Sequence, residues 1–365
     1  MSSSRAGFIA LLASGFAATV LPLAGCASRS SGESPDGAPR SAEDIERINP
    51  RALPMFDGAT GAPLSWDDLL ARIDAVQVII IGEQHDDALG HRVQQALVAD
   101  ALAHAGDTAS SYALSLEMLE RDEQAVVDDY LAGIIDRDRF IEETASTRWR
   151  AISTEYLSGA IKRSEFKSKI TSVGWIKWDE FYQPSIDAAK QAGARVVAAN
   201  APWARYTSLI TREDGYSKLE SLSPAQRELV AWPDPVPASG YRERFWQFMA
   251  GRKEGEAPAE RPEHQPGDPH SGQFTDEEIL TGLMKQMLYD ATMAESITRA
   301  LRSGATGVIH FVGQFHSDFE GGTVIETRRR APDARVLTLS LVHEGDGAAL
   351  REEDRSRADV VVYTR

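Results

Sequence analysis

The feature that most constrains the fold is a run rich in β-branched residues, Val76–Ile81, that ends in Gly-Glu-Gln-His at positions 82–85. Such a run predicts a strand buried on both faces, as in parallel sheets covered by helices. The glycine permits a sharp turn, and residues 87–105 then carry apolar side chains at helical spacing. Since ligands of open α/β sheets bind beyond the carboxyl ends of the strands, Glu83 and His85 are candidate site residues. The alternative is an ordinary glycine turn with both side chains in solvent.

The same pattern, an apolar run between helical segments, recurs along the chain. Further strands are predicted at Tyr112–Met118, Arg195–Asn200, Gly307–Val312 and Val336–Val342, with a last edge strand at Asp359–Tyr363. Helices are predicted between them, including a long one that opens with a capping box at Thr275 and ends near Gly304. This alternation predicts an α/β fold, with a mainly parallel sheet covered by helices and a smaller helical subdomain or lid.

The lid is expected from a change of pattern in residues 203–274, within one α/β domain that spans residues 49–365. Short helical pieces rich in Trp, Tyr and Phe come first. Residues 251–273 follow, with a Pro-rich, charged composition that is typical of disorder. The aromatic side chains would cover the strand ends. The alternative interpretation is that they form the core of the helical subdomain itself.

The first residues predict a lipid-anchored protein of the bacterial cell envelope. Residues 1–25 have the charged start and apolar middle of a signal peptide, and Leu-Ala-Gly-Cys at positions 23–26 resembles the lipobox of bacterial lipoproteins, whose cysteine is lipidated. Cys26 is the only cysteine, so the chain has no internal disulfide. Residues 26–48 read as a flexible tether. The alternatives are a plain secretion signal or an inserted anchor helix.

The residue after the lipobox cysteine bears on location, and the net charge bears on partners. Ala27 follows the lipobox cysteine, and in resembling lipoproteins a residue other than Asp at this place accompanies sorting to the outer membrane. The formal net charge of −16 argues against a nucleic-acid partner, which would need a basic face.

Several strand ends carry polar side chains that a parallel sheet would bring to one edge. Besides Glu83 and His85, these are Glu117, Asn200 and His316, and His316 ends a second Gly-x-x-His motif. Two histidines and two glutamates form a donor set suited to Mn, Fe, Co or Zn, without distinguishing among them. The spacing matches no known zinc signature.

Asp290 is a further candidate for this site. It lies on the apolar stripe of the long helix, where an unpaired carboxylate would be costly to bury. The alternative is that Asp290 caps a neighbouring loop.

These motifs, taken in order, resemble one known family. The matching segments are Gly-Glu-Gln-His at 82–85, Leu-Glu-Met at 116–118, Ala-Asn-Ala-Pro at 199–202, Asp-Ala-Thr-Met-Ala at 290–294 and Gly-Gln-Phe-His at 313–316. Together they are similar to the ChaN family of haem-binding lipoproteins, within the superfamily that also holds Tiki, TraB and erythromycin esterase-like proteins. The resemblance spans residues 76–342, essentially the whole mature domain.

The resemblance implies an α/β core, haem as the cofactor, and a role in haem or iron uptake with an outer-membrane receptor and a homodimer as possible partners. No motif position identifies the haem ligand, and the tyrosine candidates are Tyr182, Tyr206, Tyr241 and Tyr289. Arginines among the aromatic residues of the lid would meet the haem propionates. They are Arg205, Arg242 and Arg244.

A second function is implied by the Tiki-like relatives. There the two Gly-x-x-His motifs and the nearby glutamate are taken as a metal-dependent hydrolytic site. On this chain, that implies catalytic roles for Glu83, His85, Glu117 and His316, with Asp290 as a further metal residue. A metal-bound water would be the nucleophile and a glutamate its general base. The same strand-end residues serve either function, so the sequence leaves both open.

Overall fold

The computed structural model describes residues 42–144, 162, 177–203, 205–233, 240–256, 275–345 and 347–365. The signal peptide, Cys26 and most of both the tether and the 251–273 loop lie outside the described residues, so the predictions made for them stay predictions. The last residues of the tether form a short helix, α1 (Ala42–Arg47).

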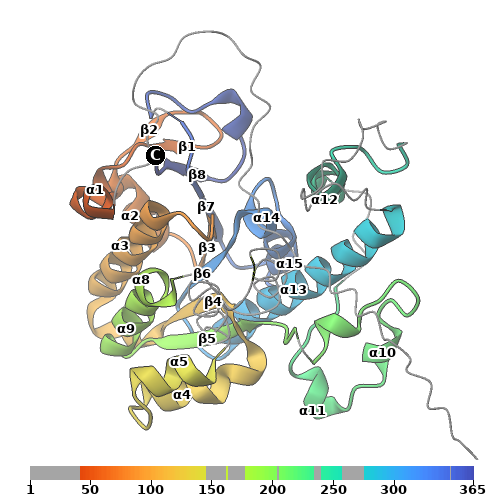
Figure 1. Cartoon of the computed structure of the whole chain (residues 1–365). Coiled ribbons are helices and arrows are strands. Elements are labelled where there is room, and N and C mark those ends of the chain that lie inside the picture. Colours follow the sequence, from red (N-terminus) through yellow and green to blue (C-terminus); the bar gives the residue numbers. More distant parts are fainter. Residues whose placement is uncertain are drawn as a thin grey trace, which may run out of the picture.

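The architecture is an eight-stranded, mostly parallel sheet with helices on both faces (Figure 1). The strands are β1 (Met55–Asp57), β2 (Pro63–Leu64), β3 (Val78–Glu83), β4 (Tyr112–Glu120), β5 (Arg195–Asn200), β6 (Gly307–Gly313), β7 (Val336–Val342) and β8 (Val360–Tyr363). Their order is β2-β1-β8-β7-β3-β6-β4-β5, and the six strands from β8 to β5 are parallel. The predicted α/β class is confirmed.

The prediction of an edge strand at the C-terminus is wrong. β8 pairs with β7 on one side and with β1, in antiparallel register, on the other. The sequence did not predict β1 and β2. These strands have only three and two residues, which is too short to show an alternating apolar pattern.

The described helices are α2 (Trp66–Asp74), α3 (Ala88–Ala105), α4 (Gln124–Leu131), α5 (Arg137–Glu143), α8 (Trp178–Phe181), α9 (Gln183–Gln191), α10 (Ser217–Glu220), α11 (Pro224–Arg227), α12 (Gly240–Ala250), α13 (Asp276–Arg302), α14 (Gln314–Ser317) and α15 (Gly322–Arg330). Capping boxes begin α2 at Ser65 and α13 at Thr275, where each hydroxyl accepts a backbone N–H that the helix leaves unpaired.

The central strand β3 separates two hydrophobic layers. Ile79 and Ile81 face one side and pack with α2, α3 and α9. Val78 and Ile80 face the other and pack with α13 and α15. This alternation follows from the two-residue repeat of a strand. Because both faces are covered, β3 is buried throughout and needs apolar residues on each side.

The segment predicted as a lid packs on α13. Tyr206, Leu219 and Val230 form one apolar cluster with Leu288, and Figure 1 shows α10 and α11 on one side of α13. A second cluster on α12 is formed by Tyr241, Phe245 and Trp246 with Ile279 and Leu283. Most of these aromatic side chains are therefore core residues of small helical units, as the alternative interpretation held.

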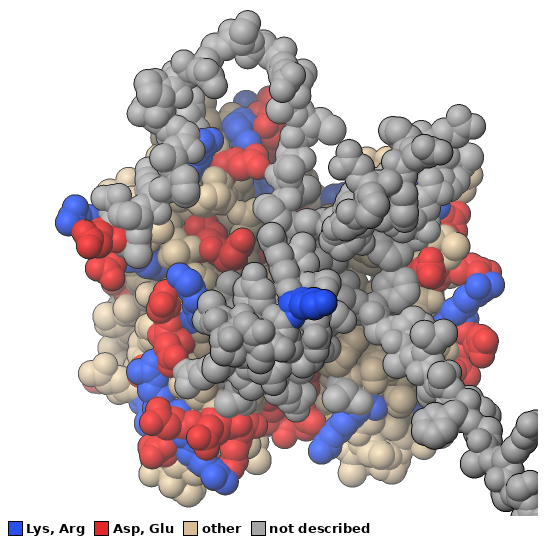
Figure 2. Space-filling model, in the orientation of Figure 1, with Lys and Arg blue, Asp and Glu red and all other residues tan. Residues whose placement is uncertain are grey.

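The surface is acidic at one corner. Figure 2 shows Asp and Glu side chains gathered over α4 and α5, where Asp128, Asp136, Asp138, Glu142 and Glu143 are exposed. None of the helices in the described part of the chain combines the length and the apolar character needed to cross a bilayer.

Candidate functional site

The first histidine of the site is held by a carboxylate at the end of β3. His85 Nδ1 lies 2.8 Å from Glu83 Oε1. The same carboxylate accepts the Tyr182 hydroxyl at 2.6 Å and the side-chain amide of Gln94 at 2.5 Å. Glu83 is 2 % exposed and Tyr182 is fully buried. We call this arrangement the Glu83–His85 dyad.

The second histidine is held in the same way by a carboxylate from α13. His316 Nδ1, on α14, lies 2.7 Å from Asp290 Oδ1. Asp290 also accepts the Thr323 hydroxyl at 2.8 Å and the Tyr241 hydroxyl at 2.6 Å. We call this arrangement the Asp290–His316 dyad. Asp290 is thus a partner of a histidine, and the alternative that it only caps a loop does not describe its contacts.

Glu117 lies between the two dyads. The register of β4 against β5 shifts between Leu116 and Glu120, and such bulges re-aim side chains near functional sites. Glu117 Oε2 accepts the Gly313 N–H at 2.7 Å, and its Oε1 lies 3.8 Å from His316 Nε2. A Cβ on Gly313 would lie 3.0 Å from His85 Nε2 and 3.7 Å from Glu117 Oε2. His316 Nε2 therefore faces Glu117 directly, and His85 Nε2 lies near the same carboxylate, across Gly313.

Both histidines of the site have raised pKa values. Burial disfavours the charged form of His316, but Asp290 and Glu117 outweigh it and raise the pKa of His316 to about 9. Burial is likewise outweighed at His85, whose pKa is raised by Glu83 and Glu117. The pKa of Glu83 is lowered to about 2 against burial, because His91, whose Nδ1 lies 3.7 Å from Glu83 Oε2, and His85 stabilise the carboxylate. Alternating positive and negative groups thus keep this buried cluster stable.

The structure brings the five predicted metal residues together, with two of the carboxylates on one side of the imidazoles and Glu117 on the other. Glu83 and Asp290 direct their oxygens at the Nδ1 side of the imidazoles, whereas the Nε2 atoms lie on the side of Glu117. Carboxylates behind histidines are typical of metal-bound imidazoles. Among the described residues, no group of three or more His, Cys, Asp or Glu side chains is arranged to hold a metal ion. A metal role for these five residues stays a prediction.

Asn200 remains at the end of β5. Its side-chain oxygen accepts the Ala201 N–H at 2.8 Å, so it caps the strand end locally. Gln94 and Thr323, by contrast, complete the dyads and were not predicted. Gln94 is a fully buried amide on the apolar face of α3, and this placement is the signal that could have identified it.

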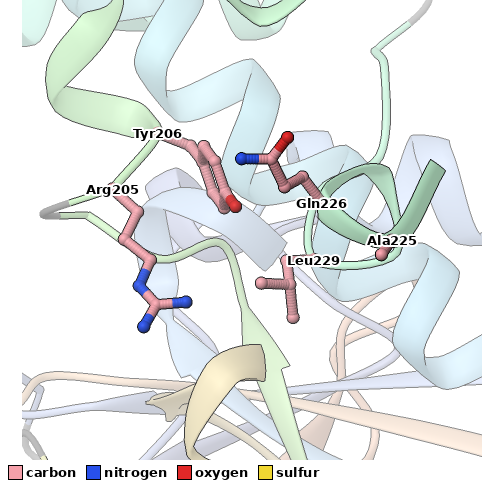
Figure 3. A pocket seen from close by; sticks show the side chains of 5 residues that line it. All are labelled: Arg205, Tyr206, Ala225, Gln226 and Leu229. Atoms are coloured by element: carbon pink, nitrogen blue, oxygen red, sulfur yellow. The ribbon is translucent and has the colours of Figure 1, made fainter. Parts of the chain in front are cut away.

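The four candidate tyrosines differ in what their hydroxyls contact. Those of Tyr182 and Tyr241 donate to the dyad carboxylates. Burial raises the pKa of Tyr289 well above its ordinary value. Tyr206 alone lines an open cavity of about 510 Å³, together with Arg205, Ala225, Gln226 and Leu229. Figure 3 shows the Tyr206 ring between Arg205 on one side and Gln226 and Leu229 on the other.

The three arginines predicted to meet haem propionates also lie in different places. Arg205 is at the cavity and pairs with Asp122 through Nε at 3.1 Å. Arg242 forms an ion pair with Glu254, and Arg244 donates to the carbonyl of Asp318 at 3.2 Å. Of these three arginines, Arg205 alone lines the cavity beside Tyr206.

The fold and the strand-end site define an α/β protein whose polar cluster lies beyond the carboxyl ends of a parallel sheet. Its sequence matches the family model described as haem-binding uptake, Tiki superfamily, ChaN, over residues 69–157 and 151–326, which is more than half of the chain. The chain belongs to this family, as the resemblance of its motifs predicted.

Two solved structures match the chain, and the first is similar in fold. ChaN of Campylobacter jejuni, described as binding haem cofacially, has a TM-score of 0.51 at 15% identity and covers 85% of this chain and 95% of its own. The type III effector HopBA1 has a TM-score of 0.38 at 14% identity, with coverage of 87% and 98%. No curated protein sequence matches the chain.

Proposed function

We propose that the chain binds haem and acts in haem or iron uptake at the bacterial cell envelope. The observation that carries the proposal is the match to a family of haem-binding uptake proteins over most of the domain. The fold agrees, since it resembles that of a ChaN described as binding haem. Bound haem would supply a ferric centre held for transfer.

The cavity beside Tyr206 is the candidate haem site. Its volume of about 510 Å³ lies within the range of ligand pockets, roughly 300–1,000 Å³. Tyr206 lines this cavity and would be the axial donor, because a phenolate oxygen suits ferric iron. Arg205, whose side chain is 60% exposed, would meet a propionate. Leu229 supplies an apolar wall.

Titration of the purified domain with haemin, followed by absorbance, tests this assignment. Tyr206→Phe should weaken haem binding by at least about tenfold, or about 1.4 kcal/mol. Tyr216→Phe is the matched control, because this tyrosine of the same segment donates its hydroxyl inward, to the carbonyl of Met284 at 2.7 Å. His316→Ala should retain most of the affinity. A wild type that does not bind haemin would refute the proposed function. Binding that depends on His316 and not on Tyr206 would place haem at the strand ends.

The proposed location rests on the sequence at positions 23–26. We propose that lipidated Cys26 anchors the protein, and that the tether presents the haem domain at the outer membrane, near a haem or iron receptor or in a homodimer. Cys26→Ser should release the protein from the membrane fraction, since the several acyl chains of a lipoprotein hold stably where one holds weakly. Equal fractionation of wild type and variant would contradict the anchor.

Hydrolysis at the strand ends is the second candidate function. The observation that favours it is the pair of dyads whose Nε2 atoms lie on the side of Glu117, since imidazoles oriented by carboxylates are suited to proton transfer. Ester and peptide hydrolysis would be assayed with and without added Mn²⁺, Co²⁺ or Zn²⁺. Activity lost in His85→Ala and His316→Ala, but retained in Tyr206→Phe, would establish the strand ends as a hydrolytic site.

A further inference from the structure

The two dyads are built alike, although their parts come from opposite sides of the sheet. Each carboxylate accepts one imidazole N–H, one tyrosine hydroxyl and one further side-chain donor. Glu83 belongs to the layer of α3 and α9, with Tyr182 at the junction of α8 and α9. Asp290 belongs to the layer of α13, with Tyr241 on α12. Each helical layer therefore supplies one tyrosine–carboxylate–histidine unit.

The tyrosines restrict how each carboxylate can rotate. An ionised carboxylate only accepts hydrogen bonds, so the Nδ1 atom that faces it must carry a proton. If the carboxylate turned, it would lose the hydroxyl bond at 2.6 Å inside a buried site, which costs about 1–3 kcal/mol. Tyr182 and Tyr241 are 0% and 1% exposed, so bulk solvent does not reach either hydroxyl. A carboxylate that cannot turn keeps its imidazole ring in one orientation.

We propose that Tyr182 and Tyr241 are positioning residues that lock the two carboxylates, so that the Nε2 atoms of His85 and His316 stay directed at a substrate bound beside Glu117. This inference rests on the strand-end site of the second candidate function. It also separates these tyrosines from haem ligation, because each hydroxyl is already used within the protein. Burial beside a carboxylate raises both tyrosine pKa values well above the ordinary value, which keeps the hydroxyls protonated and donating.

The test measures the imidazole protons directly, without a substrate. In protein labelled with ¹⁵N at its eight histidines, the Nδ1–H protons of His85 and His316 should give two downfield signals, assigned by their loss in His85→Gln and His316→Gln. Tyr182→Phe should shift the His85 signal and speed its solvent exchange about tenfold. Tyr241→Phe should do the same to the His316 signal alone.

Tyr216→Phe is the control variant. It removes a hydroxyl that touches neither dyad, so it should leave both Nδ1–H signals unchanged. Both Phe variants should bind haemin as the wild type does. Where hydrolysis is found, each should lower kcat about tenfold at unchanged KM. Signals that are missing in the wild type, or unmoved in both Phe variants, would overturn the proposal. A wild type that hydrolyses nothing yet shows the expected signals would refute the second candidate function and leave the positioning intact.

Discussion

The raised pKa of His316 predicts how the stability of the protein depends on pH. Asp290 and Glu117 raise this pKa from 6.5 to about 9 in the folded chain, whereas the unfolded chain returns to the ordinary value. Because the folded value is the higher one, the stabilisation is fully present below about pH 6.5 and is lost as the pH rises through about 9. At about 1.4 kcal/mol per pH unit, the two values correspond to about 3 kcal/mol.

Urea unfolding of the domain between about pH 6 and about pH 10 measures this effect. His316→Gln keeps a polar side chain but cannot titrate, so its unfolding free energy should fall less steeply than that of the wild type, by about 3 kcal/mol over this range. His104→Gln is the control, because His104 pairs with Asp74 at the surface, where its side chain is 64% exposed. Parallel curves for the wild type and His316→Gln would refute the charged Asp290–His316 dyad.

Three further predictions concern packing and capping, and each is measured by urea unfolding. Gly322→Ala should destabilise the fold by about 1–3 kcal/mol, because the added Cβ would lie 2.0 Å from Asp290 Oδ2; an unchanged midpoint would mean that α15 shifts freely. Arg121→Met should cost about 1–3 kcal/mol, because Ser296 Oγ and the Thr292 carbonyl lose a buried donor, whereas Glu295 keeps its ion pair with Arg299; a neutral result would contradict this network. Ser65→Ala should cost about 1 kcal/mol through the lost capping box, and no loss would show that α2 is held by packing alone.

The sequence predicted the parts of the fold that depend on neighbouring residues. Apolar runs located β3 to β7 to within a few residues, because a strand buried on both faces requires them. The capping box at Thr275 marked where α13 begins, since a capping box joins residues only three positions apart. The motifs at the strand ends also identified the family, and the family model confirms it.

The contacts within the site were not predictable in the same way. Tyr182 bonds Glu83 across 99 positions, and Tyr241 bonds Asp290 across 49. Nothing local in the sequence distinguishes these tyrosines from Tyr206, and all three were candidates for the same haem ligand. Packing separated them, because it buried two hydroxyls against carboxylates and left the third at a cavity.

By itself, then, the sequence determined the alternation of strands and helices and the residue types at the carboxyl edge of the sheet, because these depend on spacing along the chain. Only the tertiary structure decided the strand order and which carboxylate lies behind which histidine. The reason is that a buried carboxylate without a hydrogen-bond partner is costly. Its partners are the donors that tertiary packing places next to it, and these lie far apart in the sequence.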